Sequence, residues 1–445
     1  MTSGRAALRR LAGFDGWSAM RHRNYRLFFA GQGLSLVGTW MMTVAQSWLI
    51  LELTGEPLLL GLVAAVQWLP VLALGLFGGL IADAVPKRQT MVATQAFAML
   101  LSLTMAVLVL TGIVEVWHVL AIALLLGVRN AVDLPARQAF AVEMVGKNDV
   151  GNAVALNSAM FNGARVIGPA VAGVTIGAFG VGVAFLLDAV SYLAVIAALL
   201  AMRDEELHTR PGIERPTSVR AALDNLAEGL RYVRRTRVVL LSILTVGLVS
   251  TFGMNFTVVI PPFVQEVLRG DAAAYGFLMA ATGVGSVSSA LGIAFSGRTT
   301  PLFVGLGGAT LGLALVVLGS TDALPIALLA MFVAGLGSIA MAATANTLVQ
   351  LTVPDQLRGR VMSVYTTTFA GSTPIGGLVS GAIASGFGAA VAILVGGALS
   401  VATGVAAMAS IRGATIRAGR SRVVEGAGGE ALEVAPAGLT GVRPR

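Results

Sequence analysis

The chain of 445 residues contains no cysteine and only three histidines. Without cysteine it has no disulfide framework, no thiolate metal site and no catalytic thiol. The histidines, His22, His118 and His208, lie far apart in the sequence. This spacing argues against a histidine-based metal site, and we expect neither a metal nor another cofactor.

Charged residues are scarce, at 12% of the chain against about 25% in a soluble globular protein. Hydrophobic residues make up 56%, and the mean hydropathy is +0.84. This composition excludes an ordinary soluble domain and predicts an all-α protein that crosses a membrane many times. The net charge of +8 would suit nucleic acid, but basic loops on one side of a membrane are the commoner cause. We therefore expect no nucleic-acid partner.

Apolar runs of about twenty residues predict twelve membrane spans. They cover residues 25–51, 58–82, 90–112, 116–141, 151–178, 182–202, 238–263, 274–296, 301–320, 324–350, 360–384 and 389–411. Lys and Arg gather in the two tails and the even-numbered connections, whereas the odd-numbered connections hold only Arg269. This asymmetry places both termini in the cytoplasm of a multi-pass protein of the inner membrane.

The sequence repeats weakly with an offset of 208 residues. The matching glycines are Gly163, Gly168, Gly173 and Gly180 in the first copy and Gly371, Gly376, Gly381 and Gly388 in the second. We therefore predict two pseudo-symmetric six-helix halves in the same orientation, at residues 25–202 and 238–411. Parallel halves of this kind are a recurrent transporter architecture, with the substrate site near the midplane between them.

Three polar segments flank and join these halves. Residues 1–24 form a cytoplasmic tail, and residues 203–237 form a linker that includes an amphipathic helix, since apolar side chains recur along one face after Ser218. This helix either touches anionic lipid through its basic end or packs under the bundle as a tether. The tail at residues 412–445 is rich in Gly, Ala and Arg without periodicity, and we expect it to be disordered.

The loop after the second span, GGLIADAVPKRQ, resembles the signature of the major facilitator superfamily, G-x-x-x-D-R-x-G-R-R/K. The matching residues are Gly79, Asp83, Lys87 and Arg88. Ala84 and Pro86 stand where that signature has Arg and Gly. The resemblance implies a gate role, in which Asp83 at the mouth of the span latches one half to the other.

The fifth span contains ARVIGPAVAG, which is similar to the Gly-Pro motif of the antiporter members through Gly168, Pro169 and Gly173. DLPARQAF, ALNSAMFNGARVIGPA and VPDQLRGRVMSVY resemble the branch with enterobactin exporters and macrolide-efflux proteins, the transmembrane secretion effectors. The resemblance covers residues 20–411. It implies a monomeric secondary transporter, not an enzyme, that exports a siderophore or an amphiphilic drug-like molecule by alternating access, with protons as coupling ion.

Ionisable residues inside spans are costly, so each is a hypothesis of function. Arg129 and Asp133 share a helix face and can pair, and the resemblance implies that the fourth span lines the central cavity. Asp133 with Arg129 is therefore our candidate for proton coupling. The alternative is a static brace of Arg129, Asp133 and Arg137. Arg165 and Asp188, at similar depth on spans 5 and 6, are expected to form a structural ion pair.

Several uncharged polar side chains could line the cavity, and all but Tyr365 of span 11 fall in spans that the resemblance places around it. The substrate-contact candidates are Gln32, Gln46, Asn255, Asn346 and Tyr365. Each is also explained by a hydrogen bond between helices. Residues 335–340 fit G-x-G-x-x-A but lie in an apolar span without a preceding strand, and no Walker A sequence occurs, so nucleotide chemistry is not expected.

Two other functions are compatible with this organisation. An importer or metabolite permease would share the architecture, and only the Gly-Pro resemblance argues against it. A membrane sensor or scaffold that transports nothing is the second alternative, against which the charges at the membrane midplane argue.

Overall fold

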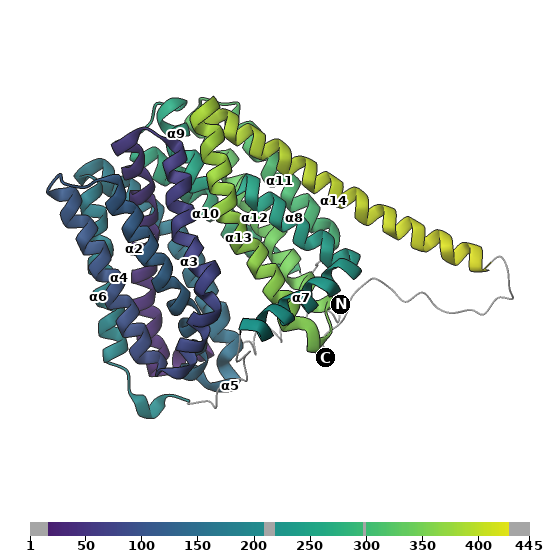
Figure 1. Cartoon of the computed structure of the whole chain (residues 1–445), viewed down its shortest axis with the longest axis horizontal. Coiled ribbons are helices and arrows are strands. Elements are labelled where there is room, and N and C mark those ends of the chain that lie inside the picture. The colour runs from purple at the N-terminus through teal and green to yellow at the C-terminus, as the bar shows by residue number, and fades with distance from the viewer. Residues whose placement is uncertain (1–16, 209–218, 297–299, 427–445) are drawn as a thin grey trace, which may run out of the picture.

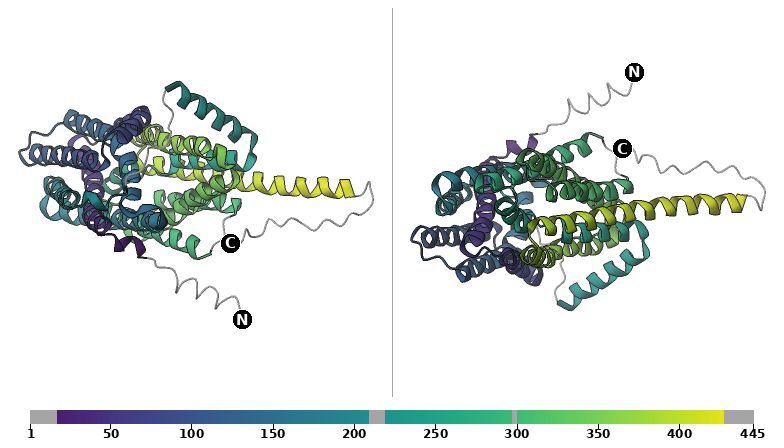
Figure 2. Two further views of the ribbon diagram at one scale, coloured as in Figure 1. Left: turned by 90° about the horizontal axis from the view of Figure 1, so that it is seen from below. Right: turned by 90° about the horizontal axis from the view of Figure 1, so that it is seen from above.

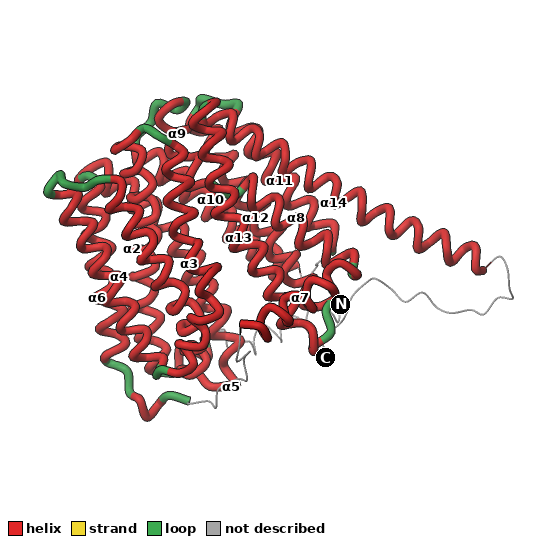
Figure 3. Tube along the Cα trace, viewed as in Figure 1, coloured by secondary structure: helices red, strands yellow, loops and turns green. Residues whose placement is uncertain are grey.

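The computed structural model describes residues 17–208, 219–296 and 300–426, and within these ranges helices are the only regular secondary structure (Figure 3). The membrane helices are α2 (Arg23–Thr54), α3 (Pro57–Ala84), α4 (Lys87–Leu110), α5 (Val116–Phe179), α6 (Val181–Leu200), α8 (Arg237–Gly253), α9 (Phe256–Glu266), α10 (Ala272–Ser296), α11 (Pro301–Gly319), α12 (Leu324–Thr352), α13 (Asp355–Phe387) and α14 (Ala389–Gly426). Three further elements, η1 (Ser18–Arg21), η2 (Asp204–Glu206) and α7 (Val219–Arg235), lie outside the spans.

The prediction of twelve spans is confirmed. Ten continuous helical stretches of the described chain are long and apolar enough to cross a membrane, with α8 and α9 counted together as one. One of them, α5, supplies two spans because its backbone leaves the helical region at Gly146, where φ is 69°. The twelfth span is α13, whose hydropathy is lower because Ser, Thr, Gly and Pro are distributed along the helix. Glycine adopts positive φ without a steric penalty, so one residue turns the chain where the sequence predicted a loop of nine.

The internal repeat is visible in the backbone. Gly180 ends α5 with φ 82° and Gly388 ends α13 with φ 88°, so the two predicted equivalents terminate equivalent helices in the same conformation. Gly173 of α5 lies against the start of α10, and Gly381 of α13 lies against the start of α3. Each half thus offers the same helix to the other half, as pseudo-twofold symmetry requires.

The two halves meet at one end of the bundle, which we call the far end. It carries the loop at Gly55 and the C-terminal ends of α5 and α13; the other end carries Gly146 and α7 and is called the linker end. Near the far end, a Cβ atom built on Gly61 of α3 would lie 2.2 Å from the carbonyl oxygen of Gly377 of α13. Backbone therefore meets backbone without intervening side chains.

The halves separate toward the linker end (Figure 1). Gly163 of α5 and Gly371 of α13 lie two to three turns nearer that end than the contacts of Gly173 and Gly381. A Cβ atom at either would meet no other residue within 4 Å. The structure is thus closed at the far end and open at the linker end.

The linker and the last helix give different outcomes for the sequence predictions. The predicted amphipathic helix is α7, which packs against α13: Gly229 faces the backbone of Arg360, and Glu228 pairs with the Arg360 guanidinium. This contact fits the alternative in which the linker helix packs under the bundle as a tether.

The last helix differs from the prediction. Helix α14 continues to Gly426 and projects from the bundle (Figure 2), so residues 412–426 are helical where disorder was predicted. Alanine and arginine are good helix formers, and extending an existing helix needs no nucleation. Residues 427–445 lie outside the described chain.

Candidate functional site

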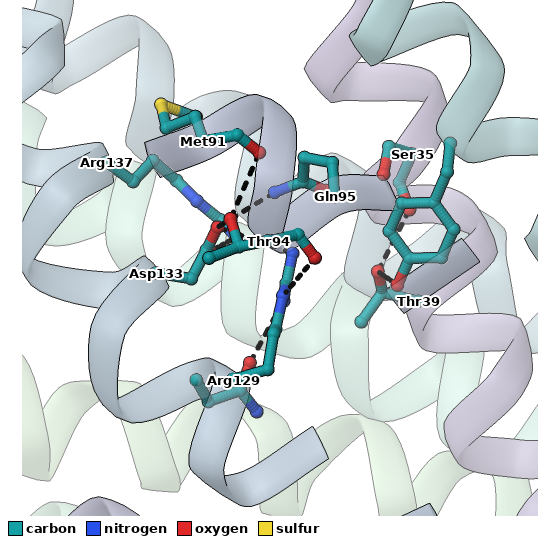
Figure 4. A network of polar contacts seen from close by, with 10 residues as sticks. Ser35, Thr39, Met91, Thr94, Gln95, Arg129, Asp133 and Arg137 are labelled. Atoms are coloured by element: carbon teal, nitrogen blue, oxygen red, sulfur yellow. Dashed lines mark hydrogen bonds and ion pairs between the residues drawn. The ribbon is translucent and has the colours of Figure 1, made fainter. Parts of the chain in front are cut away.

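Asp133 is the centre of a polar cluster inside the N-terminal half (Figure 4). Its carboxyl group is fully buried and accepts hydrogen bonds from the Thr94 hydroxyl at 2.7 Å and the Gln95 amide at 2.9 Å. Arg129 approaches the same oxygen, Oδ1, at 3.4 Å, and Arg137 pairs with the other oxygen. Two cations and two neutral donors replace the water that this carboxylate lost on burial.

These partners show which way Asp133 points. Thr94 and Gln95 belong to α4, and Arg129 also donates to the Thr94 carbonyl at 3.2 Å. Asp133 thus faces its own half, away from the interface between the halves. The geometry has the form of the brace of Arg129, Asp133 and Arg137, and it joins the fourth span to the third.

The predicted ion pair between Arg165 and Asp188 is wrong. The Asp188 carboxyl accepts from the Ser102 hydroxyl at 2.7 Å, whereas the Arg165 guanidinium lies over the indole of Trp40, 5.7 Å from its centroid. Helix α2 lies between them, because Gly38 of α2 faces Asp188. Successive residues of a helix are rotated by about 100°, so Trp40, two residues further on, points to nearly the opposite side of α2. Equal depth in the membrane did not bring the two charges to the same side of α2.

Asp188 is left with an incomplete set of partners. Its side chain is fully buried, Ser102 occupies Oδ2, and Oδ1 has no hydrogen-bond donor. Oδ1 lies beside Gly38 of α2, close enough that a Cβ atom there would be 2.7 Å away. Among the described residues no cation reaches ion-pair distance of this carboxyl group.

Three of the five predicted substrate contacts take part in hydrogen bonds between or within helices. The other two, Gln32 and Gln46 of α2, are 1% and 4% exposed, and Gln32 Oε1 and Gln46 Nε2 have no hydrogen-bond partner. Asn255, between α8 and α9, donates to the Ser380 hydroxyl at 3.2 Å. Asn346 accepts from Gln350 at 2.5 Å, and the Tyr365 hydroxyl donates to the Ala342 carbonyl at 3.1 Å. These bonds join neighbouring helices or successive turns of one helix.

The loop signature connects three helices of the N-terminal half. Lys87 forms an ion pair with Glu143 of α5 at 3.2 Å. Arg88 donates to the carbonyls of Leu199 and Leu200 at the end of α6 and pairs with Asp204 at 2.5 Å. Cations at the C-terminal end of a helix donate hydrogen bonds to its free carbonyls and interact favourably with the negative end of its dipole. Gly79 and Asp83 lie within α3, in a part of the helix whose side-chain surroundings are outside the described structure.

The Gly-Pro motif joins α5 to two other helices. Gly168 faces α2, where a Cβ atom built on the glycine would lie 2.4 Å from the Trp40 Cβ. Gly173 faces α10, where a Cβ atom built on it would lie 2.9 Å from the Ala272 carbonyl oxygen. The carbonyl of Pro169 lies against Gly276 of α10. The motif therefore supplies both the packing within its own half and the contact with the other half.

Several partners in these sites were not predicted. Thr94, Gln95 and Ser102 on α4, and Glu143 on α5, complete the sites of Asp133, Asp188 and Lys87. The sequence carries one signal for them: Gln95 and Ser102 are seven residues apart, about two turns, and so lie on one face of α4, the pattern of a polar stripe that faces a neighbouring helix. Among the residues that the structure describes, no group of His, Cys, Asp and Glu could hold a metal.

Comparison with known proteins agrees with this architecture. A family described as transmembrane secretion effectors, of the major facilitator superfamily, matches residues 14–421. The multidrug efflux pump Tap of Mycolicibacterium fortuitum is 27% identical over 372 residues, 81% of this chain and 87% of that protein. The staphyloferrin A transporter of Staphylococcus aureus is 23% identical over 267 residues, 60% of this chain and 66% of its own length.

Solved structures share the fold at low identity. A bacterial homologue of the human lysosomal transporter Spinster, inward-facing and unoccupied, aligns with TM-score 0.68 and 15% identity, covering 87% of this chain and 96% of its own. The nucleoside transporter NupG aligns with TM-score 0.65 and 14% identity over 87% and 98% of the two chains.

Proposed function

The chain belongs to the transmembrane secretion effector family of major facilitator transporters, and from this we propose that it exports small organic molecules from the cytoplasm in exchange for protons. The linker end is the cytoplasmic side, because the basic residues gather in the tails and connections at that end. The structure then represents the inward-facing state of an alternating-access cycle.

The observation that carries this proposal is the one-sided contact between the halves. At the far end glycines of α3 and α5 lie against the backbone of α13 and α10, whereas Gly163 and Gly371 meet nothing across the interface. A transporter in this state loads from the linker side. Rocking of one half on the other would close that side and release the cargo outside.

The relatives favour a drug-like amphiphile or a siderophore as cargo. One is named a multidrug efflux pump and another a staphyloferrin A transporter. Both names describe organic molecules much larger than an inorganic ion, which fits a site formed between two six-helix halves.

Geometry favours Asp188 over the Asp133–Arg129 pair as the proton-binding group. Asp133 is neutralised by Arg129 and Arg137 and holds its donors in place. Asp188 is buried with one oxygen unpartnered, and an isolated carboxylate is so costly in a membrane interior that it binds a proton. Movement of α2, whose Gly38 covers this oxygen, would admit water and let the proton leave.

Transport in everted membrane vesicles tests the coupling. We expect accumulation of a fluorescent amphiphile when the vesicle interior is acidic, and its loss when a protonophore collapses the gradient. D188N should abolish accumulation driven by the proton gradient while retaining downhill exchange, because a neutral amide mimics a permanently protonated carboxyl.

The matched variant is D133N, which we expect to reduce protein stability and to leave coupling intact in the protein that folds. Gradient-independent transport by the wild type would exclude antiport. Full coupling in D188N together with uncoupling in D133N would return the proton-binding role to Asp133.

A further inference from the structure

We propose that Arg165 binds an anionic group of the transported molecule, with the rings of Trp40 and Phe161 contacting its apolar body. The substrate class is thus an amphiphilic organic anion, such as an aromatic carboxylate. This inference rests on the proposed transport function and adds the charge of the cargo to it.

Arg165 differs from Lys87, Arg129 and Arg137 in having no acidic or hydrogen-bonded partner among the described residues. Arg129 and Arg137 share Asp133, and Lys87 has Glu143. Within the described chain, the one polar interaction of the Arg165 guanidinium is its position over the Trp40 ring. Its side chain is half-buried, and its nitrogens are not among the fully buried atoms that lack a partner. A cation held within a membrane span without a carboxylate indicates a functional role.

The helix geometry of α5 shows where this guanidinium lies. Arg165 precedes Gly168, which faces α2, by three residues, and it precedes Pro169, whose carbonyl faces α10, by four. Positions three and four apart are neighbours on a helix surface, so the Arg165 side chain leaves α5 between α2 and α10. Side chains also tilt toward the N-terminus of their helix, which for this span is the linker end.

The interface between the halves opens at this level. The Arg165 carbonyl still touches the other half, since a Cβ atom on Gly283 of α10 would lie 3.0 Å from it, but Gly163 has nothing within 4 Å. The guanidinium therefore stands at the inner limit of the opening. A molecule that entered from the linker side would meet it where the halves converge.

Two aromatic rings complete the candidate site. Phe161 precedes Arg165 by one turn, is 46% exposed, and packs edge-on against Trp40 with centroids 5.7 Å apart. The two rings and the cation thus lie together along the surface of α5 and α2. A guanidinium binds a carboxylate through two parallel hydrogen bonds, and the rings provide apolar area beside it.

Binding of three matched probes tests this site directly. We would measure 1-pyrenebutyrate, its neutral amide and 1-pyrenebutylamine, which share one aromatic body and differ in charge, by equilibrium dialysis of the full-length protein in nanodiscs against empty nanodiscs. The wild type should bind the carboxylate at least about tenfold more tightly than the amide, as a charge-assisted bidentate contact implies. The amine should bind most weakly.

Single substitutions distinguish the contribution of the Arg165 cation to probe binding from that of the aromatic rings. R165Q should lose the preference for the carboxylate and bind it like the amide, and R165K should keep part of the preference. W40A should weaken all three probes by a similar factor. The matched control is R237Q, which removes a cation at the linker end of α8, where Arg237 contacts the Ser410 carbonyl, and should bind as the wild type does.

Equal binding of the carboxylate by R165Q and the wild type, or no binding of it by the wild type, would overturn the inference. The melting temperature of each variant shows that it is folded, and R165K covers the case in which R165Q is not. The binding result is independent of the vesicle experiment. If binding depends on Arg165 and the charge of the probe but flux is not driven by protons, this site is retained and antiport is excluded. If flux is driven by protons but binding does not depend on Arg165, only this site is excluded.

Discussion

The Asp188 carboxyl group and Gly38 are in direct contact across the interface of α6 and α2. A Cβ atom on Gly38 would lie 2.7 Å from Asp188 Oδ1 and 2.3 Å from the Ser191 hydroxyl. The absence of a side chain at residue 38 is therefore what allows a carboxyl group to be buried between these helices.

Substitution G38A should destabilise the protein and impair transport. The added methyl group must displace two polar side chains, and overpacking of this kind costs about 1–3 kcal/mol. We expect a lower melting temperature and a reduced rate in the vesicle assay. The control is G33A on the same helix, where the nearest atom is the flexible Met160 side chain at 3.5 Å. Equal effects of the two variants would show that Gly38 has no special packing role.

A disulfide between positions 58 and 385 should arrest transport. The Leu58 amide of α3 donates to the Ser385 hydroxyl of α13 at 2.9 Å, so the cysteines of L58C and S385C would lie within reach of each other across the far end. The natural chain has no cysteine, so no other disulfide can form within it. Oxidation should stop substrate accumulation by holding the far end closed, and a reductant should restore it. The single-cysteine variants should transport in both conditions; normal transport by the linked protein would show that the far end need not open.

The pair of Lys87 and Glu143 should stabilise the N-terminal half. Both side chains are largely buried, at 19% and 11% exposure, and removal of one partner leaves the other charge without compensation. We expect K87A and E143A each to lower the free energy of unfolding by about 1–3 kcal/mol, measured by thermal melting. The charge-exchanged variant K87E/E143K should recover most of the loss. Failure of the exchange to rescue would indicate that the pair contributes little beyond packing.

The contact between η1 and α5 should weaken in acid. His22 lies 2.8 Å from Asp149, and hydrogen bonds from His22 and Ser18 hold the pKa of the Asp149 carboxyl below its usual range. A lowered pKa in the folded state stabilises the contact above the unfolded value of about 4, and this stabilisation is lost as the pH falls through the folded value. Protection of residues 18–26 from hydrogen exchange should therefore fall below about pH 4. D149N should show low protection already at neutral pH, with little further change in acid.

Membrane spans and the internal repeat could be predicted because they depend on composition and glycine spacing alone. Gly180 and Gly388 were matched by their offset and end equivalent helices with the same positive φ. Close helix packing at the glycine motifs could be predicted as well, since Gly168 and Gly173 lie where neighbouring helices approach α5 closely. Each of these features depends on a short stretch of sequence.

Side-chain partners could not be predicted, because depth in a membrane does not give direction around a helix axis. Arg165 and Asp188 are at similar depth, yet α2 lies between them, and Asp133 points at α4. The direction of each side chain depends on how the helices are rotated, which is decided by packing over the whole bundle. For the same reason Ser102 was not recognised as the partner of Asp188.

Glycine contacts at the far end bear on how easily the transporter changes state. Where Gly61 faces Gly377, the halves touch through peptide backbone. A backbone contact of this kind requires no change of rotamer when it separates. Side-chain rearrangement at this point should therefore add little to the barrier for parting the halves, so in the proposed cycle the bound cargo and proton would have the larger influence on the lifetime of the inward-facing state.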